Sequence, residues 1–209
     1  MDKGSLITFE GGEGAGKSTH IKRLKSALEV QGFRVLIVRE PGGTVVGEAI
    51  RAVLLTRDHD MMSPRTELLL YEAARAQLVD EVIRPALEEG MVVLCDRFTD
   101  STTAYQGYGR GLDIEMIKDL NLSATGGIIP VCTIVIDVPV DAGLLRATRK
   151  GEPDRLESED TAFHEAVRAG FIKIAQSDPE RVHMIDGTRK KGVVSAEIQQ
   201  IVFRVLNRV

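Results

Sequence analysis

Five short apolar runs, separated by longer amphipathic segments, constrain the fold of this chain more than any other feature. Four of the runs are rich in Val, Ile and Leu with little alternation, which is typical of parallel strands covered on both faces. Such alternation of strands and helices favours right-handed strand–helix–strand units in an open sheet, whose ligands bind at the carboxyl ends of the strands. The predicted strands are residues 5–10, 34–38, 91–95, 133–138 and 181–185.

The segments between the strands carry apolar side chains at helical spacing. Gly32 and Gly90 each follow such a segment, as glycine commonly does at helix ends. Pro85 lies inside one segment and predicts a kink there. The predicted helices are residues 17–31, 44–55, 66–89, 114–124, 140–149, 160–177 and 194–207. We therefore expect one α/β domain over residues 1–209, with a five-stranded parallel sheet flanked by helices on both faces.

Charge and composition exclude several classes of protein. The net charge of −4 provides no global positive field, so we expect no nucleic-acid partner. The 43% of hydrophobic residues excludes a disordered chain, while the apolar runs are too short to cross a bilayer. The polar N-terminus does not resemble a signal peptide, so we expect a cytoplasmic protein with no membrane partner. Cys95 and Cys132 lie in apolar runs and are expected to be buried, reduced thiols.

The first predicted strand leads into a glycine-rich segment that matches the phosphate-binding pattern G-x-x-x-x-G-K-[ST]. Glycines let backbone N–H groups turn toward phosphate oxygens, and the N-terminus of the following helix adds partial positive charge. Lys17 would reach the β- and γ-phosphates, and the Ser18 hydroxyl would bind Mg²⁺. The expected nucleotide-binding residues are Gly11, Gly12, Glu13, Gly14, Ala15, Gly16, Lys17, Ser18 and Thr19.

This loop indicates a nucleotide site but not a reaction, because GTPases, motor ATPases and kinases share it. The sequence contains no Asn-Lys-x-Asp run that would read guanine. A motor ATPase would carry Asp-Glu after an apolar strand, whereas here Asp96 is followed by Arg97. An arginine beside a metal-side aspartate suits a site that also holds a second phosphorylated molecule.

Further segments make the whole chain resemble the thymidylate kinase family. Besides the phosphate loop, the matching segments are residues 39–44, 47–51, 71–77 and 96–107, followed by a lid-like segment at 146–156. The run at 96–107, with its Asp-Arg, Ser and Ala-Tyr-Gln-Gly, is specific to the family. The resemblance implies a P-loop nucleoside-monophosphate-kinase fold with a short lid at about residues 147–157. It also implies transfer of the γ-phosphoryl group of ATP to dTMP for dTTP synthesis, with Mg²⁺ as cofactor, by a homodimer.

The resemblance assigns the phosphate and sugar ends of a dTMP site. Arg51 and Arg97 would bind the dTMP phosphate, as forked guanidinium groups can. Glu13 would accept the sugar 3′-hydroxyl, and Tyr105 would exclude a ribose 2′-hydroxyl. Pro41 would help to shape the pocket through a cis peptide bond with the preceding residue.

The resemblance also assigns the base end of the site. Tyr71 would stack on thymine, where the family usually has phenylalanine, and Arg75, one helical turn later, would bind O4 of the base. Thr102 would read the thymine edge, with Ser101 and Gln106 on the same wall.

The catalytic assignments follow the family in the same way. Asp96 would hold Mg²⁺ through water, together with Ser18, while the rival strand-end residue Asp137 is interpreted as structural. Some members carry an arginine in the phosphate loop where this chain has Gly14, so the lid would supply the catalytic cation. The lid cations are Arg146, Arg149, Lys150 and Arg155, with Arg149 the first choice. The expected catalytic residues are Lys17, Asp96, Arg97 and Arg149.

Two other functions remain open at this level. One is a kinase of the same build for another deoxynucleoside monophosphate, such as dUMP. The other is a regulator that binds nucleotide without turnover, for which a degraded acceptor site would be expected. The presence of Arg51, Arg75, Arg97 and Gln106 counts against the regulator.

Overall fold

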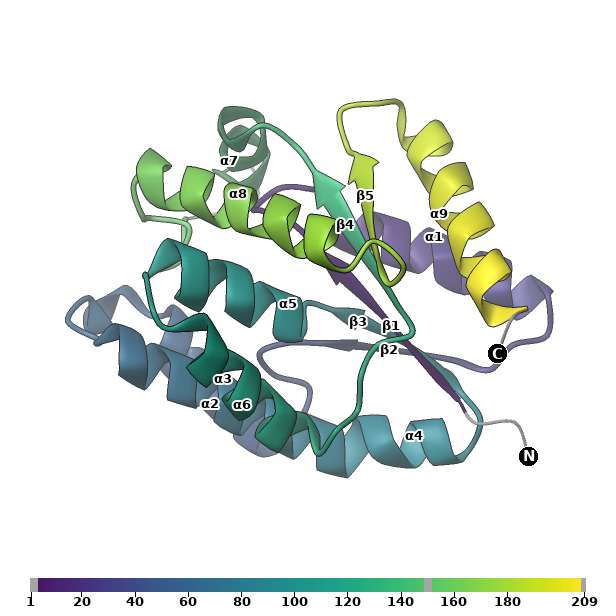
Figure 1. The fold of residues 1–209 in the computed structure, drawn as a ribbon, viewed down its shortest axis with the longest axis horizontal. Helices are drawn as coiled ribbons and strands as arrows, with labels where there is room; N and C mark the ends of the chain where they lie inside the picture. Colours follow the sequence, from purple (N-terminus) through teal and green to yellow (C-terminus); the bar gives the residue numbers. More distant parts are fainter. Residues whose placement is uncertain (1–3, 149–151, 208–209) are drawn as a thin grey trace.

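The computed structural model describes residues 4–148 and 152–207, in which a parallel sheet lies between two layers of helices (Figure 1). The strand order is β2-β3-β1-β4-β5, and every neighbouring pair is parallel. Every strand lies within one residue of its predicted bounds, so the predicted fold class is confirmed. The strands are β1 (Ser5–Glu10), β2 (Val35–Arg39), β3 (Val92–Asp96), β4 (Cys132–Asp137) and β5 (Val182–Asp186).

Helices connect the strands, and four of them begin at a side chain that accepts a hydrogen bond from the first turn, namely Thr44, Ser63, Asp113 and Asp160. A short 3₁₀ helix covers Arg57–His59, and π-helical turns cover Val79–Ile83 (η2) and Thr103–Gly109 (η3). The α-helices are α1 (Lys17–Val30), α2 (Val45–Leu55), α3 (Pro64–Leu78), α4 (Arg84–Glu88), α5 (Thr99–Thr102), α6 (Ile114–Thr125), α7 (Val140–Thr148), α8 (Thr161–Ser177) and α9 (Lys191–Leu206).

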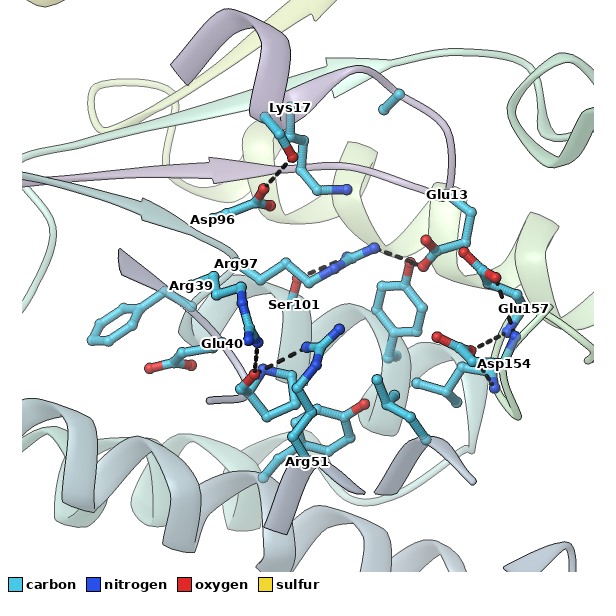
Figure 2. A pocket seen from close by; sticks show the side chains of 18 of the residues that line it. Glu13, Lys17, Arg39, Glu40, Arg51, Asp96, Arg97, Ser101, Asp154 and Glu157 are labelled. Atoms are coloured by element: carbon cyan, nitrogen blue, oxygen red, sulfur yellow. Dashed lines mark hydrogen bonds and ion pairs between the residues drawn. The ribbon is translucent and has the colours of Figure 1, made fainter. Parts of the chain in front are cut away.

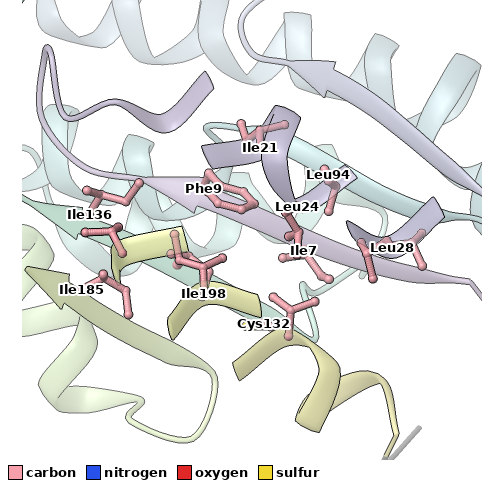
Figure 3. Close-up of a cluster of buried hydrophobic side chains, with 14 of the residues drawn as sticks. Ile7, Phe9, Ile21, Leu24, Leu28, Leu94, Cys132, Ile136, Ile185 and Ile198 are labelled. Atoms are coloured by element: carbon pink, nitrogen blue, oxygen red, sulfur yellow. The ribbon is translucent and has the colours of Figure 1, made fainter. Parts of the chain in front are cut away.

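The core has two sides because successive strand residues point to opposite faces of the sheet. On one face, Ile7 and Phe9 of β1 pack with apolar side chains of α1 and α9 (Figure 3). On the other face, Leu6 packs with residues of α3, η2 and α4, and Val135 of β4 packs with residues of η3 and α8. Cys95 and Cys132 are buried free thiols, as predicted. Of the helices that the structure describes, none is long and apolar enough to span a membrane.

The structure differs from the prediction at Pro85. The long predicted helix over 66–89 is interrupted not by a simple kink but by the π-helical turn η2, which ends just before Arg84 and Pro85. Proline lacks an N–H donor, and its ring crowds the carbonyl group four residues earlier. A wider turn relieves that crowding, and α3, η2 and α4 follow one another without an intervening loop.

The sequence prediction missed the helix formed by α5 and η3, over residues 99–109. This segment is rich in Thr, Ser and Gly and lacks a regular apolar stripe. It is stabilised instead by packing against α8, where Gly170 leaves room for the Tyr108 ring. The missed helix matters because it carries one wall of the candidate site.

Candidate functional site

A pocket of about 310 Å³ opens at the carboxyl ends of the central strands (Figure 2). The phosphate loop lies at one end, and α2, α3 and the α5–η3 helix enclose the other. Gly11 and Gly12 line a separate small cavity behind the loop. The sequence-predicted residues that line the main pocket are Glu13, Gly14, Ala15, Gly16, Lys17, Ser18, Thr19, Pro41, Arg51, Tyr71, Arg75, Asp96, Arg97, Ser101, Thr102, Tyr105 and Gln106.

The phosphate loop needs glycine at two points of close approach. Gly11 has φ +127°, and a Cβ atom there would lie 2.4 Å from the carbonyl oxygen of Ile136. Gly14 has φ +63°, and a Cβ there would lie 2.0 Å from the carbonyl oxygen of Gly143 in α7. The loop is therefore pressed against both β4 and α7.

Lys17, at the first position of α1, folds back over this loop. Its Nζ donates to the carbonyl oxygens of Gly11 and Gly12 at 3.0 and 3.1 Å. Burial and the nearby Arg97 charge lower the pKa of Lys17 to about 8, although Glu13 and other carboxylates act in the opposite direction. The ammonium group is thus held where an anionic ligand would stabilise it.

The oxygens expected to bind a metal lie together. The Ser18 hydroxyl donates to Oδ2 of Asp96 at 2.8 Å, and both residues line the pocket. Within residues 4–148 and 152–207 there is no cluster of three or more His, Cys, Asp or Glu side chains that could hold a metal. Mg²⁺ commonly binds through one or two protein oxygens and the phosphates of its nucleotide, so this pair fits Mg²⁺. Asp137, which the sequence analysis interprets as structural, forms a bidentate ion pair with Arg168 at 2.7 and 2.9 Å.

Arg97 and Glu13 meet in the middle of the pocket (Figure 2). Arg97 Nη2 and the Tyr105 hydroxyl both donate to Oε1 of Glu13, at 2.6 and 2.7 Å. The Arg97 guanidinium also lies 4.9 Å from the centre of the Tyr105 ring. Burial alone would raise the pKa of Glu13, but Arg97, Lys17 and Tyr105 outweigh it and lower that pKa to about 2. Glu13 is therefore ionised at neutral pH, next to the phosphate loop.

Two arginines meet at the carbonyl oxygen of Pro41. Arg39 Nη1 donates to it at 2.9 Å and Arg51 Nη1 at 3.0 Å. The Glu40–Pro41 peptide bond is cis, as the resemblance implied. Arg39 also forms a bidentate ion pair with Glu48, at 2.8 and 2.9 Å. These contacts bring two guanidinium groups to this end of the pocket, although Glu48 offsets the charge of Arg39.

Arg75 is fully buried, and protein groups already occupy most of its donors. Its Nε binds Glu40 at 2.8 Å, while its two Nη atoms bind Glu72, Asn121 and Thr102 at 2.6, 2.8 and 2.9 Å. Two carboxylates raise the pKa of Arg75 although burial opposes them, so the group stays charged. Arg75 therefore reaches the pocket as part of a rigid network.

The α5–η3 helix presents its side chains in pairs four residues apart. Ser101 and Tyr105 form one pair, and Thr102 and Gln106 form the other, so all four face the pocket. Below them, buried Glu10 accepts hydrogen bonds from the Phe98 N–H group and the Ser101 hydroxyl. Burial and Asp100 raise the pKa of Glu10 to about 8.

The comparisons with known proteins agree on one family. The family model described as thymidylate kinase matches residues 9–198. A thymidylate kinase from Geobacter sulfurreducens is 49% identical over 99% of this chain and 98% of its own length, and one from Deinococcus radiodurans is 48% identical over 95% and 96%.

This chain belongs to the thymidylate kinase family.

A solved structure supports the family fold. The crystal structure of the thymidylate kinase from Ehrlichia chaffeensis superposes with a TM-score of 0.78 and 34% identity, covering 96% of this chain and 99% of that one. The P-loop nucleoside-monophosphate-kinase fold is thereby confirmed.

The lid region of this family member only partly matches the sequence prediction. Ala147 lines the pocket but is still helical, because α7 continues to Thr148. Arg146 is exposed, and its Cβ lies 3.0 Å from the position of a Cβ built on Gly14. Arg149 and Lys150 lie outside the described residues. Arg155 is buried outside the pocket lining, where it binds Glu67 and a backbone carbonyl, so it is not placed as a lid cation facing the pocket.

Sequence reasoning missed four charged residues of the pocket lining, namely Arg39, Glu40, Asp154 and Glu157. Arg39 could have been found, because it is the last residue of β2 and opens the Arg-Glu-Pro-Gly-Gly segment. Asp154 and Glu157 gave no comparable signal, since they lie in an irregular segment whose path depends on tertiary contacts.

Proposed function

We propose that this protein transfers the γ-phosphoryl group of ATP to dTMP, giving ADP and dTDP. One observation carries the proposal: the phosphate loop and an arginine-lined acceptor site line the same pocket, in a chain of the thymidylate kinase family. Phosphoryl transfer requires positioning and charge neutralisation rather than a covalent intermediate. This chain offers both, with Lys17 at the donor end and Arg97 at the acceptor end.

The donor end binds ATP. Backbone N–H groups of the loop and the N-terminus of α1 surround the phosphates, and Lys17 turns from its loop carbonyls toward them. Ser18 and Asp96 hold Mg²⁺, which neutralises phosphate charge when bound.

The acceptor end binds the phosphate and sugar of dTMP. Arg97 and Arg51 hold the phosphate and aim it at the γ-phosphoryl group, supported by the neighbouring Arg39. The ionised Glu13 accepts the sugar 3′-hydroxyl, and Tyr105 fills the space beside the 2′ carbon. Pro41 shapes this end through its carbonyl group and cis peptide bond.

The base lies against Tyr71, a half-buried ring on α3. Four protein partners occupy most N–H donors of Arg75, so few remain for the base. The chief role of the arginine is therefore to form a rigid side of the pocket against which the base lies. Thr102 and Gln106 complete this edge, and Ser101 supports it from the neighbouring turn.

A cation from the lid balances the charge of the transferring group. Arg149 is the candidate, because Gly14 leaves the phosphate loop without an arginine and Arg155 is committed to buried partners. Lys150 and Arg146 are the alternatives in this segment.

The protein acts as a cytoplasmic homodimer. The dimer is supported by exposed apolar side chains on the adjacent helices α2, α3 and α6, namely Val46, Val53, Leu69 and Leu122. The compartment is supported by two free thiols in the core.

The first prediction tests the reaction itself. We expect the protein to release ADP from Mg-ATP with dTMP, and to favour dTMP over dUMP in kcat/KM by about 10–200-fold, the worth of one methyl group in an apolar pocket. The assay is ADP release against a panel of nucleoside monophosphates. Preference for dUMP would favour the other kinase, and ATP binding without turnover on any acceptor would favour a regulator.

A further inference from the structure

Glu67 on α3 is a buried carboxylate that receives donors from three parts of the chain. Gln106 Nε2 donates to Oε1 at 2.9 Å, Arg110 binds both oxygens at 3.1 and 3.0 Å, and Arg155 Nη1 lies 2.6 Å from Oε2. Burial raises the pKa of Glu67, but the bonds from Arg110 and Gln106 outweigh it and lower the pKa. Glu67 is therefore an ionised carboxylate bound by three side chains, although no step of the proposed reaction uses it.

Arg155 fixes residues 152–159, which include the C-terminal part of the predicted lid and which we call the lid-side segment. Its backbone N–H donates to the carbonyl oxygen of Leu55 at 3.2 Å, and its Nε donates to that of Leu54 at 2.9 Å. These carbonyls lie at the C-terminus of α2, where helical partners are lacking. The remaining end of the guanidinium reaches Glu67. One side chain therefore ties the segment to both α2 and α3.

The neighbours of Arg155 point into the active-site pocket. Asp154, Leu156 and Glu157 line it, while Arg155 does not (Figure 2 shows the two acidic residues). Oδ1 of Asp154 accepts the backbone N–H groups of Leu156 and Glu157, both at 2.9 Å, which closes a tight turn. The position of Arg155 therefore decides how its three neighbours face the substrates.

On its other side, Glu67 holds the wall of the dTMP pocket. Gln106 lines that pocket, and Tyr71 lies one helical turn after Glu67 on α3. Arg110, just after η3, adds a second connection, because its Nη2 also lies 2.6 Å from Oε1 of Glu159 in the lid-side segment.

We propose that Glu67 is a positioning residue that joins the lid-side segment to the dTMP pocket wall, holding Arg155 on one side and Gln106 on the other. The proposal rests on the proposed function and adds to it a physical connection between acceptor binding and the lid. Removing one partner of a buried ion pair leaves an uncompensated charge, so the connection is costly to break.

The test is a double-mutant cycle between Arg155→Met and Gln106→Leu, two positions whose only shared partner in the described contacts is Glu67. Residues without contact normally show additive effects. If Glu67 joins them, each single variant raises the KM for dTMP, and the double variant departs from the product of the single effects by about threefold or more. Arg34→Met, at an exposed ion pair, is the matched control and leaves every constant unchanged.

A second cycle places Arg155→Met in a Glu67→Gln background. In that background we expect Arg155→Met to raise the KM for dTMP little further, because the carboxylate that binds Arg155 has already been replaced. The proposal is overturned if, in both cycles, the KM of the double variant changes by the product of the two single effects. So would variants that lower Tm while leaving kcat and both KM values unchanged, since that pattern belongs to a purely structural network. Should Glu67→Gln fail to fold, the first cycle decides alone.

The wild-type assay separates this proposal from the proposed function. If the wild-type enzyme phosphorylates a different monophosphate, the function is corrected, and the same cycles are measured as calorimetric Kd values for that acceptor. If no acceptor is turned over, calorimetric Kd values for dTMP itself give the coupling. Additivity in those Kd values would overturn the role of Glu67, whatever the reaction.

Discussion

Arg97 is constrained by the site in both its backbone and its side chain. Its φ of +71° lies in the left-handed region, the sole such case among the non-glycine residues that the structure describes. Its N–H donates to the carbonyl oxygen of Phe9 at 2.9 Å, which holds this conformation in place. Strained backbone of this kind costs about 1–3 kcal/mol and commonly occurs where a side chain must be aimed. Here it directs a guanidinium group at Glu13 and at the acceptor end of the pocket.

Two substitutions of Arg97 separate the role of its side chain from the effect of its strained backbone. Arg97→Ala removes the phosphate contact, so we expect kcat/KM for dTMP to fall by about 10²–10³-fold while ATP affinity changes little. Arg97→Gly loses the same contact but accepts positive φ, so it should be more stable than Arg97→Ala by about 1 kcal/mol. Steady-state kinetics and thermal unfolding check both expectations. If the variant binds ATP and dTMP more weakly by the same factor, Arg97 belongs to the donor end instead.

At the scale of elements, α7 rests directly on the phosphate loop. A Cβ atom on Gly143 would lie 2.4 Å from the carbonyl oxygen of Glu13, and one on Gly14 would meet Gly143. The helix that leads toward the lid and the loop that binds phosphate are therefore in backbone contact. No motif marks Gly143, because its role arises only when β4 brings α7 beside β1.

Gly143→Ala should displace the phosphate loop. We expect a higher KM for ATP and a loss of about 1–3 kcal/mol in the free energy of unfolding, because the new methyl group has no space. Gly192→Ala on α9 is the matched control, since a Cβ there meets nothing within 4 Å and alanine favours helix. Steady-state kinetics at varied ATP concentration and urea unfolding measure both variants. An unchanged KM would show that the loop tolerates the shift.

The elements differ in how far the sequence predicts them. The strands were predicted to within one residue, because buried parallel strands are continuous apolar runs. The α5–η3 helix was missed because its 99–109 sequence has no apolar stripe, and η2 because a π-helical turn has no simple sequence signature. The candidate acceptor residues on the α5–η3 helix were predicted only through the resemblance to the family. Arg155 was misplaced because the sequence does not show that the fold pairs this arginine with the buried carboxylate of Glu67.

For the whole molecule, both helical layers expose apolar side chains, and more of them lie on the layer formed by α2, α3 and α6. Helices α2, α3 and α6 neighbour one another on one side of the sheet, while α1 and α9 lie on the other (Figure 1). The first layer exposes Leu69 and Leu122, whose side chains are about half accessible. Apolar side chains gathered over adjacent helices are typical of an interface between subunits.

Leu69→Glu should therefore convert a dimer into a monomer, because a charge would be buried at the contact. Val193→Glu on α9 places the same charge on the opposite layer and should leave the mass unchanged. Light scattering after size-exclusion chromatography measures both. A wild-type protein that elutes as a monomer would contradict the proposed dimer, and a dimeric Leu69→Glu would move the interface elsewhere.

The contact between Gly14 and Gly143 also limits which side chains the phosphate loop can carry. An arginine in place of Gly14 would need φ +63°, and its Cβ would meet the carbonyl oxygen of Gly143. Any side chain at position 14 would therefore have to displace either the phosphate loop or α7, so a single backbone contact keeps this position without a side chain.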